Sequence, residues 1–214
     1  MTTGGEDSSP RSRSRFGWVR AASDRVPTRW FAGIATGLFL LATAAFGGLA
    51  TAATPPITAL EPGAEHRNDQ LALTIERAVL VDEFPEAGVF VDDGERVLAL
   101  VVSAENMWSE PLAASPNSSV TESLTIDGLP AMPDSVARYD DATLNPTLQP
   151  GVPAEIVLAW AVEAGDFADA QRLAVTLNDM TLYTGSFVAN GQWWTDPIAT
   201  ATATIAIEDI GAGG

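Results

Sequence analysis

The chain has 214 residues and a net charge of −17 at pH 7, and it contains neither cysteine nor lysine. Its length fits one domain with appendages. The missing cysteine excludes disulfides, a thiol nucleophile and the lipid-modified cysteine of a lipoprotein, and the missing lysine excludes a phosphate-loop lysine and a Schiff base. With only one histidine, His66, the chain has no paired-histidine metal motif.

The charge is divided unevenly along the chain. Residues 1–29 contain six arginines and three acidic residues, whereas the remainder contains five arginines and 25 acidic residues. An acidic globular part is repelled by nucleic acid and by anionic lipid headgroups, so we expect no nucleic-acid partner. Residues 1–29 are poor in apolar residues and are predicted to form a disordered, arginine-rich cytoplasmic tail. The run SSPRSRSR at 8–15 fits either a tail that sets membrane topology or a phosphorylation site.

A stretch without charge or proline follows at residues 30–53. As a helix it would be about 36 Å long, and a bilayer core is roughly 30 Å thick. The sequence predicts a transmembrane signal-anchor helix here, with a signal peptide cleaved after Ala52 as the alternative. The upstream arginines place the N-terminus in the cytoplasm and the C-terminal domain outside the cell membrane. Gly33 and Gly37 have the spacing of a helix–helix contact.

Residues 54–69 contain three prolines and are predicted to form an extended stalk. His66 lies in this segment. Because a metal site needs several converging ligands and no second histidine or cysteine exists, we expect His66 to be an exposed stalk residue.

From residue 70 the apolar residues recur with a period of two, which is typical of strands with one buried face. Residues 97–102 are apolar on both faces, which indicates a central strand. In the first strand Arg77 interrupts the apolar face and marks a bend. The residues predicted to share the buried face of that strand are Leu71, Leu73, Ile75, Val79 and Val81.

Later strands are predicted at 123–126, 135–139, 155–162, 173–182 and 199–207. A phase shift at Asn178-Asp179 predicts a bulge, and Asn190-Gly191 predicts a tight hairpin turn. The pattern predicts an all-β fold over residues 70–210. We expect an immunoglobulin-like antiparallel β-sandwich of about seven strands, with Trp160 in its core.

The segment LQPGVPAEIVLAW at 148–160 is followed, after a hairpin, by a final strand of Thr, Ala and Ile. With this turn-then-strand order, residues 68–210 resemble uncharacterised bacterial cell-envelope proteins that have a telokin-like immunoglobulin fold. The resemblance implies a sandwich fold and an envelope location. It transfers no catalytic residue to this chain.

Two features are candidates for ligand contact. Residues 82–95 form an acidic loop that fits either Ca²⁺ binding or a solvated surface, and Asp140-Asp141 would join such a site only if the fold brought it near. Trp193 and Trp194 are adjacent on a strand, so their side chains point to opposite faces. One indole therefore fits a partner or ligand contact, and the alternative is that one ring packs into the core while the other covers a strand edge.

No arrangement of residues predicts a catalytic, cofactor-binding or metal site, so we expect a protein that is not an enzyme. The leading hypothesis is a single-pass membrane-anchored protein that presents an immunoglobulin-like domain outside the cell for protein binding or scaffolding. Its partner would be an envelope or membrane protein, and it would need no cofactor. The alternatives are a secreted or anchored module for a sugar or Ca²⁺, and an accessory subunit of a membrane complex.

Overall fold

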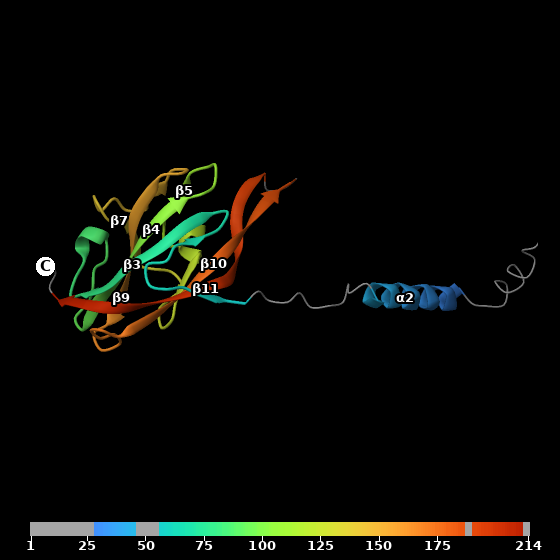
Figure 1. Ribbon diagram of the computed structural model, residues 1–214, viewed down its shortest axis with the longest axis horizontal. Coiled ribbons are helices and arrows are strands. Elements are labelled where there is room, and N and C mark those ends of the chain that lie inside the picture. The colour runs from blue at the N-terminus through green and yellow to red at the C-terminus, as the bar shows by residue number, and fades with distance from the viewer. Residues whose placement is uncertain (1–27, 46–55, 187–189, 212–214) are drawn as a thin grey trace, which may run out of the picture. The chain divides into compact units, whose positions relative to one another are not determined.

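The structure is a computed structural model that describes residues 28–45, 56–186 and 190–211 (Figure 1). The chain divides into two compact units, Met1–Thr54 and Pro55–Gly214, and each is described by itself.

The first unit contains helix α2 (Thr28–Ala45). In the part of the chain that is described, no helix combines the length and the apolar character needed to span a membrane. Residues 46–53 of the predicted anchor, with the cleavage site after Ala52, lie outside the described residues. The transmembrane anchor therefore stays a prediction from the sequence.

The second unit is built almost entirely of strands. Two short helical segments interrupt them, η1 (Pro85–Ala87) and α3 (Ser119–Glu122), which the sequence analysis does not predict. The strands are β1 (Thr58–Ala59), β2 (His66–Arg67), β3 (Leu71–Val81), β4 (Glu95–Asn106), β5 (Leu112–Ala113), β6 (Leu124–Ile126), β7 (Ser135–Arg138), β8 (Thr147–Leu148), β9 (Pro153–Glu163), β10 (Arg172–Gly185) and β11 (Gly191–Gly211).

The strands pair in the order β6-β10-β11-β3-β4-β9-β7, with β1 added beside β11 and β2 beside β3, while β5 and β8 pair separately. Seven of the described strands have three or more residues, which agrees with the expected number. The expectation of a purely antiparallel sandwich is wrong, because β11 runs parallel to both β1 and β3.

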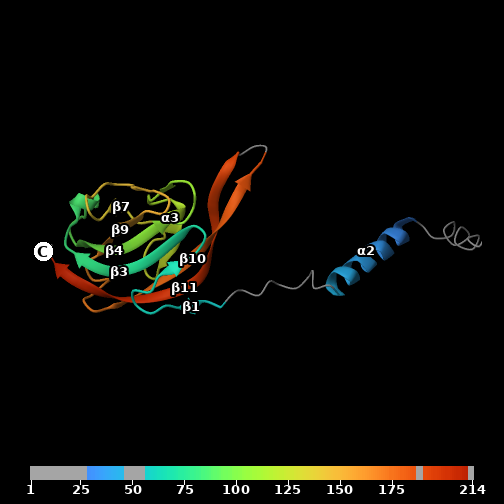
Figure 2. The same cartoon turned by 45° about the horizontal axis from the view of Figure 1, so that its top comes forward.

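Strand β11 joins two layers that face each other across the core (Figures 1 and 2). Its first part pairs antiparallel with β10, and its last part, from Ile207, pairs parallel with β3. Side chains from both layers form one buried cluster, to which Leu100 and Trp160 contribute from one layer and Val175 and Leu177 from the other. The domain is therefore a β-sandwich with a mixed sheet, and Trp160 lies in its core as predicted.

A bulge in β3 changes which residues face this core. The pairing of β3 with β4 shifts between Ile75 and Arg77, at the bend that the sequence predicts. An inserted residue reverses the alternation that follows it, because side chains alternate with a period of two. Ala78 and Leu80 therefore face the core, and the prediction that Val79 and Val81 share the face of Leu71 is wrong.

The displaced valines belong to a second apolar cluster on the outer face of the β3–β4–β9 layer. Strand β4 lies between β3 and β9 and is apolar on both faces, as residues 97–102 predict. The segment after β3 folds over part of this outer face. The outer cluster comprises Val79, Val81, Val89, Val97, Ala99, Val101, Val157 and Ala159, with Phe84, Val91 and Ala161 packed against it.

The segment predicted as a stalk instead contributes two short strands to the sandwich. Strand β2 pairs with β3, and β1 pairs with β11. The expectation that His66 is exposed is wrong, because its side chain is 12 % exposed and its Nε2 lies 2.8 Å from Oδ1 of Asp179. The same oxygen accepts a 2.8 Å hydrogen bond from Asn68 Nδ2. The pairing connects this segment to the bulge of β10, a long-range contact that the local sequence does not reveal.

The bulge itself is confirmed, since the register of β10 against β11 shifts after Leu177 and again after Asp179. The hairpin between these strands is also confirmed, but the position predicted for its turn is wrong. Gly191 already pairs with Gly185, so Asn190-Gly191 is not the two-residue turn that the sequence suggested. Phe187 and Val188 lie outside the described residues.

Candidate functional site

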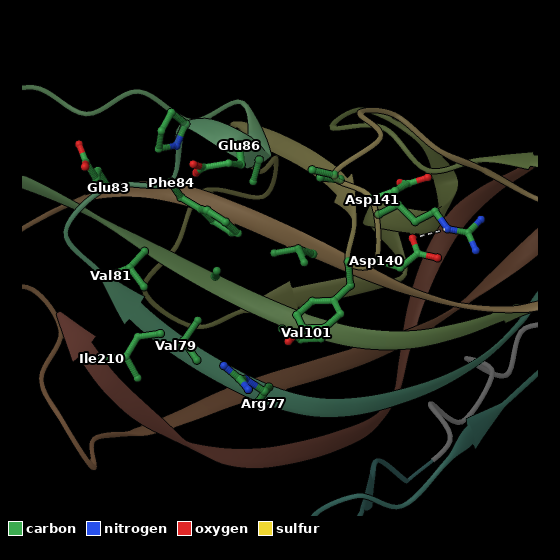
Figure 3. Close-up of a pocket in the computed structure, with 18 residues that line it drawn as sticks. Arg77, Val79, Val81, Glu83, Phe84, Glu86, Val101, Asp140, Asp141 and Ile210 are labelled. Carbon is green, nitrogen blue, oxygen red and sulfur yellow. Dashed lines mark hydrogen bonds and ion pairs between the residues drawn. The ribbon is translucent and has the colours of Figure 1, made fainter. Parts of the chain in front are cut away.

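A cavity of about 680 Å³ lies on the outer face of the β3–β4–β9–β7 layer. Figure 3 shows the side chains around it. We call this cavity, together with its walls, the outer groove. It is lined by Arg77, Val79, Val81, Glu83, Phe84, Pro85, Glu86, Ala87, Ala99, Val101, Ala137, Arg138, Tyr139, Asp140, Asp141, Ala142, Val157 and Ile210.

The floor of the outer groove is apolar and rigidly placed. Val79, Val101 and Val157 come from three neighbouring strands and are buried. Their backbones pair in a continuous ladder, in which Val79 lies opposite Ala99, and Val101 lies opposite Val157. A floor held on central strands keeps its shape when a ligand binds, since the strands cannot shift without breaking the ladder.

One wall is the segment that leads through η1. Pro85 stands at the start of η1, where its fixed φ suits the first helical position. Gly88 closes the turn with φ of 78°, a conformation that favours glycine. The Ser135 hydroxyl donates a hydrogen bond to the carbonyl of Ala87, and this bond ties the wall to β7. A Cβ at position 88 would lie 3.2 Å from the side chain of Leu144, so the two walls meet here.

The second wall is the loop after β7. Its backbone folds tightly, with hydrogen bonds of 2.9 Å from Arg138 N to Thr143 O and 3.0 Å from Ala142 N to Arg138 O. Asp141 Oδ1 accepts a 2.9 Å hydrogen bond from Thr143 N, and this bond lowers the pKa of the Asp141 carboxyl. Tyr139 stands exposed on this wall and presents an aromatic ring to the groove.

Four carboxylates and two guanidinium groups line the outer groove. Arg138 Nε donates a 2.7 Å hydrogen bond to Asp140, and this bond raises the pKa of Arg138. Glu83 and Glu86 make none of the described hydrogen bonds or ion pairs. Unlike Arg138, Arg77 has a buried Nε without a hydrogen-bond partner among the described residues. The groove thus combines an apolar floor, an acidic rim and one guanidinium that lacks a partner.

The structure brings together the two acidic segments that the sequence analysis considered. Glu83 and Glu86 from the acidic loop and Asp140-Asp141 line the same cavity. Other acids of the loop are engaged elsewhere, since Arg96 Nε donates a 2.9 Å hydrogen bond to Asp82. Within the described ranges, no three acidic or histidine side chains are placed to hold a metal ion. Ca²⁺ binding therefore gains no support from the geometry.

The two predicted tryptophans do point in opposite directions. Trp194 is 8 % exposed and packs edge-on against Trp108, with ring centroids 6.0 Å apart. Trp193 is 39 % exposed and lies against Tyr183 on the neighbouring strand, with centroids 4.7 Å apart. Only Trp193 is therefore available to a partner. Gly33 and Gly37 lie in α2, and no heavy atom of the described residues lies within 4 Å of a Cβ built on either.

The outer groove was not predicted from the sequence. Its signal was present in β3, where Ala78, Val79, Leu80 and Val81 are apolar on both faces after Arg77. A strand that is apolar on both faces needs a cover on each. In this domain the cover on the outer face is incomplete, and the gap is the groove.

No protein-family model and no curated protein sequence matches the chain. Among solved structures, it is similar to a "putative lipoprotein" (ycdA) from Bacillus subtilis, with 14 % identity, a TM-score of 0.31 and coverage of 66 % of this chain. The chain spans only 38 % of that protein. It is also similar to an uncharacterized β-sandwich protein from Clostridium difficile, with 10 % identity, a TM-score of 0.37 and coverage of 72 % of this chain and 97 % of that one.

A third similar structure is a "putative lipoprotein" from Staphylococcus aureus, with 9 % identity, a TM-score of 0.36 and coverage of 69 % of this chain and 94 % of that one. Likenesses this low assign neither a fold family nor a function. The telokin-like immunoglobulin family therefore stays a prediction.

Proposed function

We propose that the protein is a membrane-anchored binding module of the cell envelope, and not an enzyme. The β-sandwich is presented outside the cell membrane, and it binds a segment of another envelope protein in the outer groove. The observation that carries the binding role is a cavity whose apolar floor lies beside a guanidinium for which the described residues supply no partner. Concave, largely apolar sites with a few convergent polar groups are the usual form of a ligand pocket.

The anchoring part of the proposal rests on the sequence alone. Residues 30–53 carry no charge, and six arginines precede them. Such a distribution favours insertion with the N-terminus in the cytoplasm. The acidic domain would then face away from the anionic lipid surface of the cytoplasmic leaflet, which avoids an unfavourable electrostatic interaction.

Site-specific photo-cross-linking in living cells tests the binding role. A benzophenone amino acid replaces Tyr139 on one wall or Glu86 on the other, and both positions are exposed. A ligand held in the groove contacts both walls, so both positions should yield an adduct with the same envelope protein. The matched control is Asp127, an exposed residue outside the lining of the groove. Adducts that are the same from all three positions, or absent from both walls, would contradict the proposal.

The exposed pair Tyr183 and Trp193 supports a second candidate function, the binding of a sugar in the envelope. Aromatic faces stack on the apolar faces of sugars, and Trp193 keeps much of its ring exposed although it packs against Tyr183. This surface lies on the hairpin of β10 and β11, and neither residue lines the outer groove.

A further inference from the structure

Arg77 holds a buried donor for which the described residues supply no acceptor. None of the described hydrogen bonds or ion pairs involves its guanidinium, whereas Arg138, the other arginine that lines the groove, is paired with Asp140. Burying a donor of a charged group without a partner is unfavourable. The terminal nitrogens of Arg77 are not among the buried atoms without a partner, and they make none of the described hydrogen bonds or ion pairs, so they are the donors that a ligand meets in the groove.

The chemistry of that ligand group follows from the guanidinium. Its planar fork matches a carboxylate, to which it donates two parallel hydrogen bonds. Arg77 also lies beside the apolar floor, because the bulge that turned Val79 outward turned Arg77 to the same face. In a ligand whose carboxylate pairs with Arg77, the group next to that carboxylate would therefore lie on the apolar floor.

The acidic residues around the floor determine which charge the rest of the ligand can carry. Glu83, Glu86, Asp140 and Asp141 surround the floor, and only Asp140 is paired with an arginine. These carboxylates repel a second negative charge and favour basic groups. A multiply charged anion such as a nucleotide or an anionic lipid headgroup does not fit this pattern.

We propose that the outer groove binds the C-terminal end of a basic peptide chain. The terminal carboxylate pairs with Arg77, apolar side chains of the last residues cover Val79 and Val101, and a lysine or arginine further upstream faces Asp140 and Asp141. This inference rests on the proposed function and names the ligand class of its site. A volume of about 680 Å³ lies within the usual range for ligand pockets and fits a short segment.

The test uses the full-length protein in detergent micelles and two pools of randomised hexapeptides, one with free C-terminal carboxylates and one with C-terminal amides. The peptides retained from each pool are identified by mass spectrometry. Retention should favour the carboxylate pool, with apolar residues at the last positions and lysine or arginine upstream. Equal retention from both pools, or no retention from either at millimolar concentration, would overturn the inference.

The retained peptide with the highest affinity is then titrated against variants. Arg77→Gln and amidation of the peptide should each weaken binding at least tenfold, and amidation should cause no further loss in the Arg77→Gln protein. Arg172→Gln, a change at an exposed arginine outside the groove, is the matched control and should bind as the original protein does. Independent losses from Arg77→Gln and amidation would show that the two groups do not pair, and would overturn the inference.

Two further measurements separate this inference from other outcomes. Arg77→Gln removes a charge for which the described residues supply no partner, so the melting temperature of the variant should equal or exceed that of the original protein. That result would exclude unfolding as the cause of lost binding.

Dodecanoate tests for a fatty acid in place of a peptide, and binding of dodecanoate alone would overturn the peptide assignment. If position 139 still cross-links to a partner while amidation of the peptide's terminal carboxylate leaves binding unchanged, this inference fails and the proposed function stands.

Discussion

At the scale of single residues, one inserted residue in β3 creates the candidate site. The bulge after Ile75 places Arg77 and Val79 on the outer face, where a regular strand would have directed Val79 into the core. The result is an apolar surface that the loop through Phe84 covers only in part. Without the bulge Val79 and Val81 would face the core, and Ala78 and Leu80 would take their places on the outer face beside the apolar residues of β4 and β9.

A second residue-scale feature holds the end of β11 against the layer that carries the groove. Asp209 accepts hydrogen bonds of 2.8 and 2.7 Å from the two terminal nitrogens of Arg96 and one of 3.0 Å from Gly211 N. The bonds from Arg96, and then the bond from Gly211, lower the pKa of Asp209 from 3.8 to about 2. A carboxyl whose pKa is lower in the folded state stabilises the fold above its unfolded pKa, and this contribution is lost as the pH falls through the folded value.

We therefore expect Asp209→Asn to lower the melting temperature by a few degrees at pH 6, and the difference from the original protein to shrink as the pH falls from about 4 to about 2. Thermal unfolding followed by circular dichroism across this range measures the difference. Asp127→Asn, at an exposed carboxylate without a described ion pair, is the control and should follow the original protein at every pH. A constant deficit of Asp209→Asn down to pH 2 would show that the charge of Asp209 is not the cause.

Some residue-scale features of the site are visible in the local sequence, and others depend on contacts between distant segments. The bend at Arg77 is visible locally, because a charge interrupts an apolar alternation. Its consequence for Val79 is not visible, since valine is equally compatible with either face. The meeting of Asp140-Asp141 with Glu86 in one cavity depends on the pairing of β7 with β9 and on the path of the η1 segment. The contact of His66 with Asp179 joins residues 113 positions apart, a distance over which local patterns carry no information.

At the scale of elements, the hairpin of β10 and β11 has two distinct parts. Near its turn it extends beyond the other strands, as Figures 1 and 2 both show, and there its two strands pair only with each other. A positive φ of 54° at Asp196 and the adjacent Pro197 mark the junction with the sandwich. Trp194 packs into the main core from this region, whereas Trp193 lies on the opposite side of the strand.

The two tryptophans are therefore expected to differ in their contribution to stability. Trp194→Ala removes a buried ring and should lower the free energy of unfolding by about 3–5 kcal/mol. Trp193→Ala removes an exposed ring and its contact with Tyr183, and should cost less than about 1.5 kcal/mol. Urea unfolding of both variants measures the two losses. Trp194→Phe, which keeps an aromatic ring and removes an indole N–H without a partner, is the control for the buried position and should lose much less than Trp194→Ala.

Equal losses from Trp193→Ala and Trp194→Ala would contradict the division of the hairpin into a core side and an exposed side. The sequence predicted this hairpin and the opposite directions of the two rings, because adjacent residues in a strand alternate. It did not predict which ring is buried. That depends on Trp108, which reaches Trp194 from a different part of the chain.

At the scale of the whole molecule, charge and hydropathy divide the chain into parts suited to different environments. The arginines of residues 1–29, the uncharged residues 30–53 and the acidic β-sandwich follow one another along the chain. The sandwich supplies the outer groove, and we propose that residues 30–53 keep it at the membrane surface. An anchor raises the local concentration of the domain near other envelope proteins, so a groove of modest affinity is sufficient.

The most direct test of this account is fractionation of the native protein, carrying a C-terminal tag, followed by determination of its intact mass. The account predicts a full-length species of 22.4 kDa plus the tag in the membrane fraction. Its tagged domain should be digested by a protease added outside cells whose envelope has been opened but whose cell membrane is intact. A species that begins near Ala53 in a soluble fraction, or a domain protected from external protease, would contradict the proposed anchor and its topology.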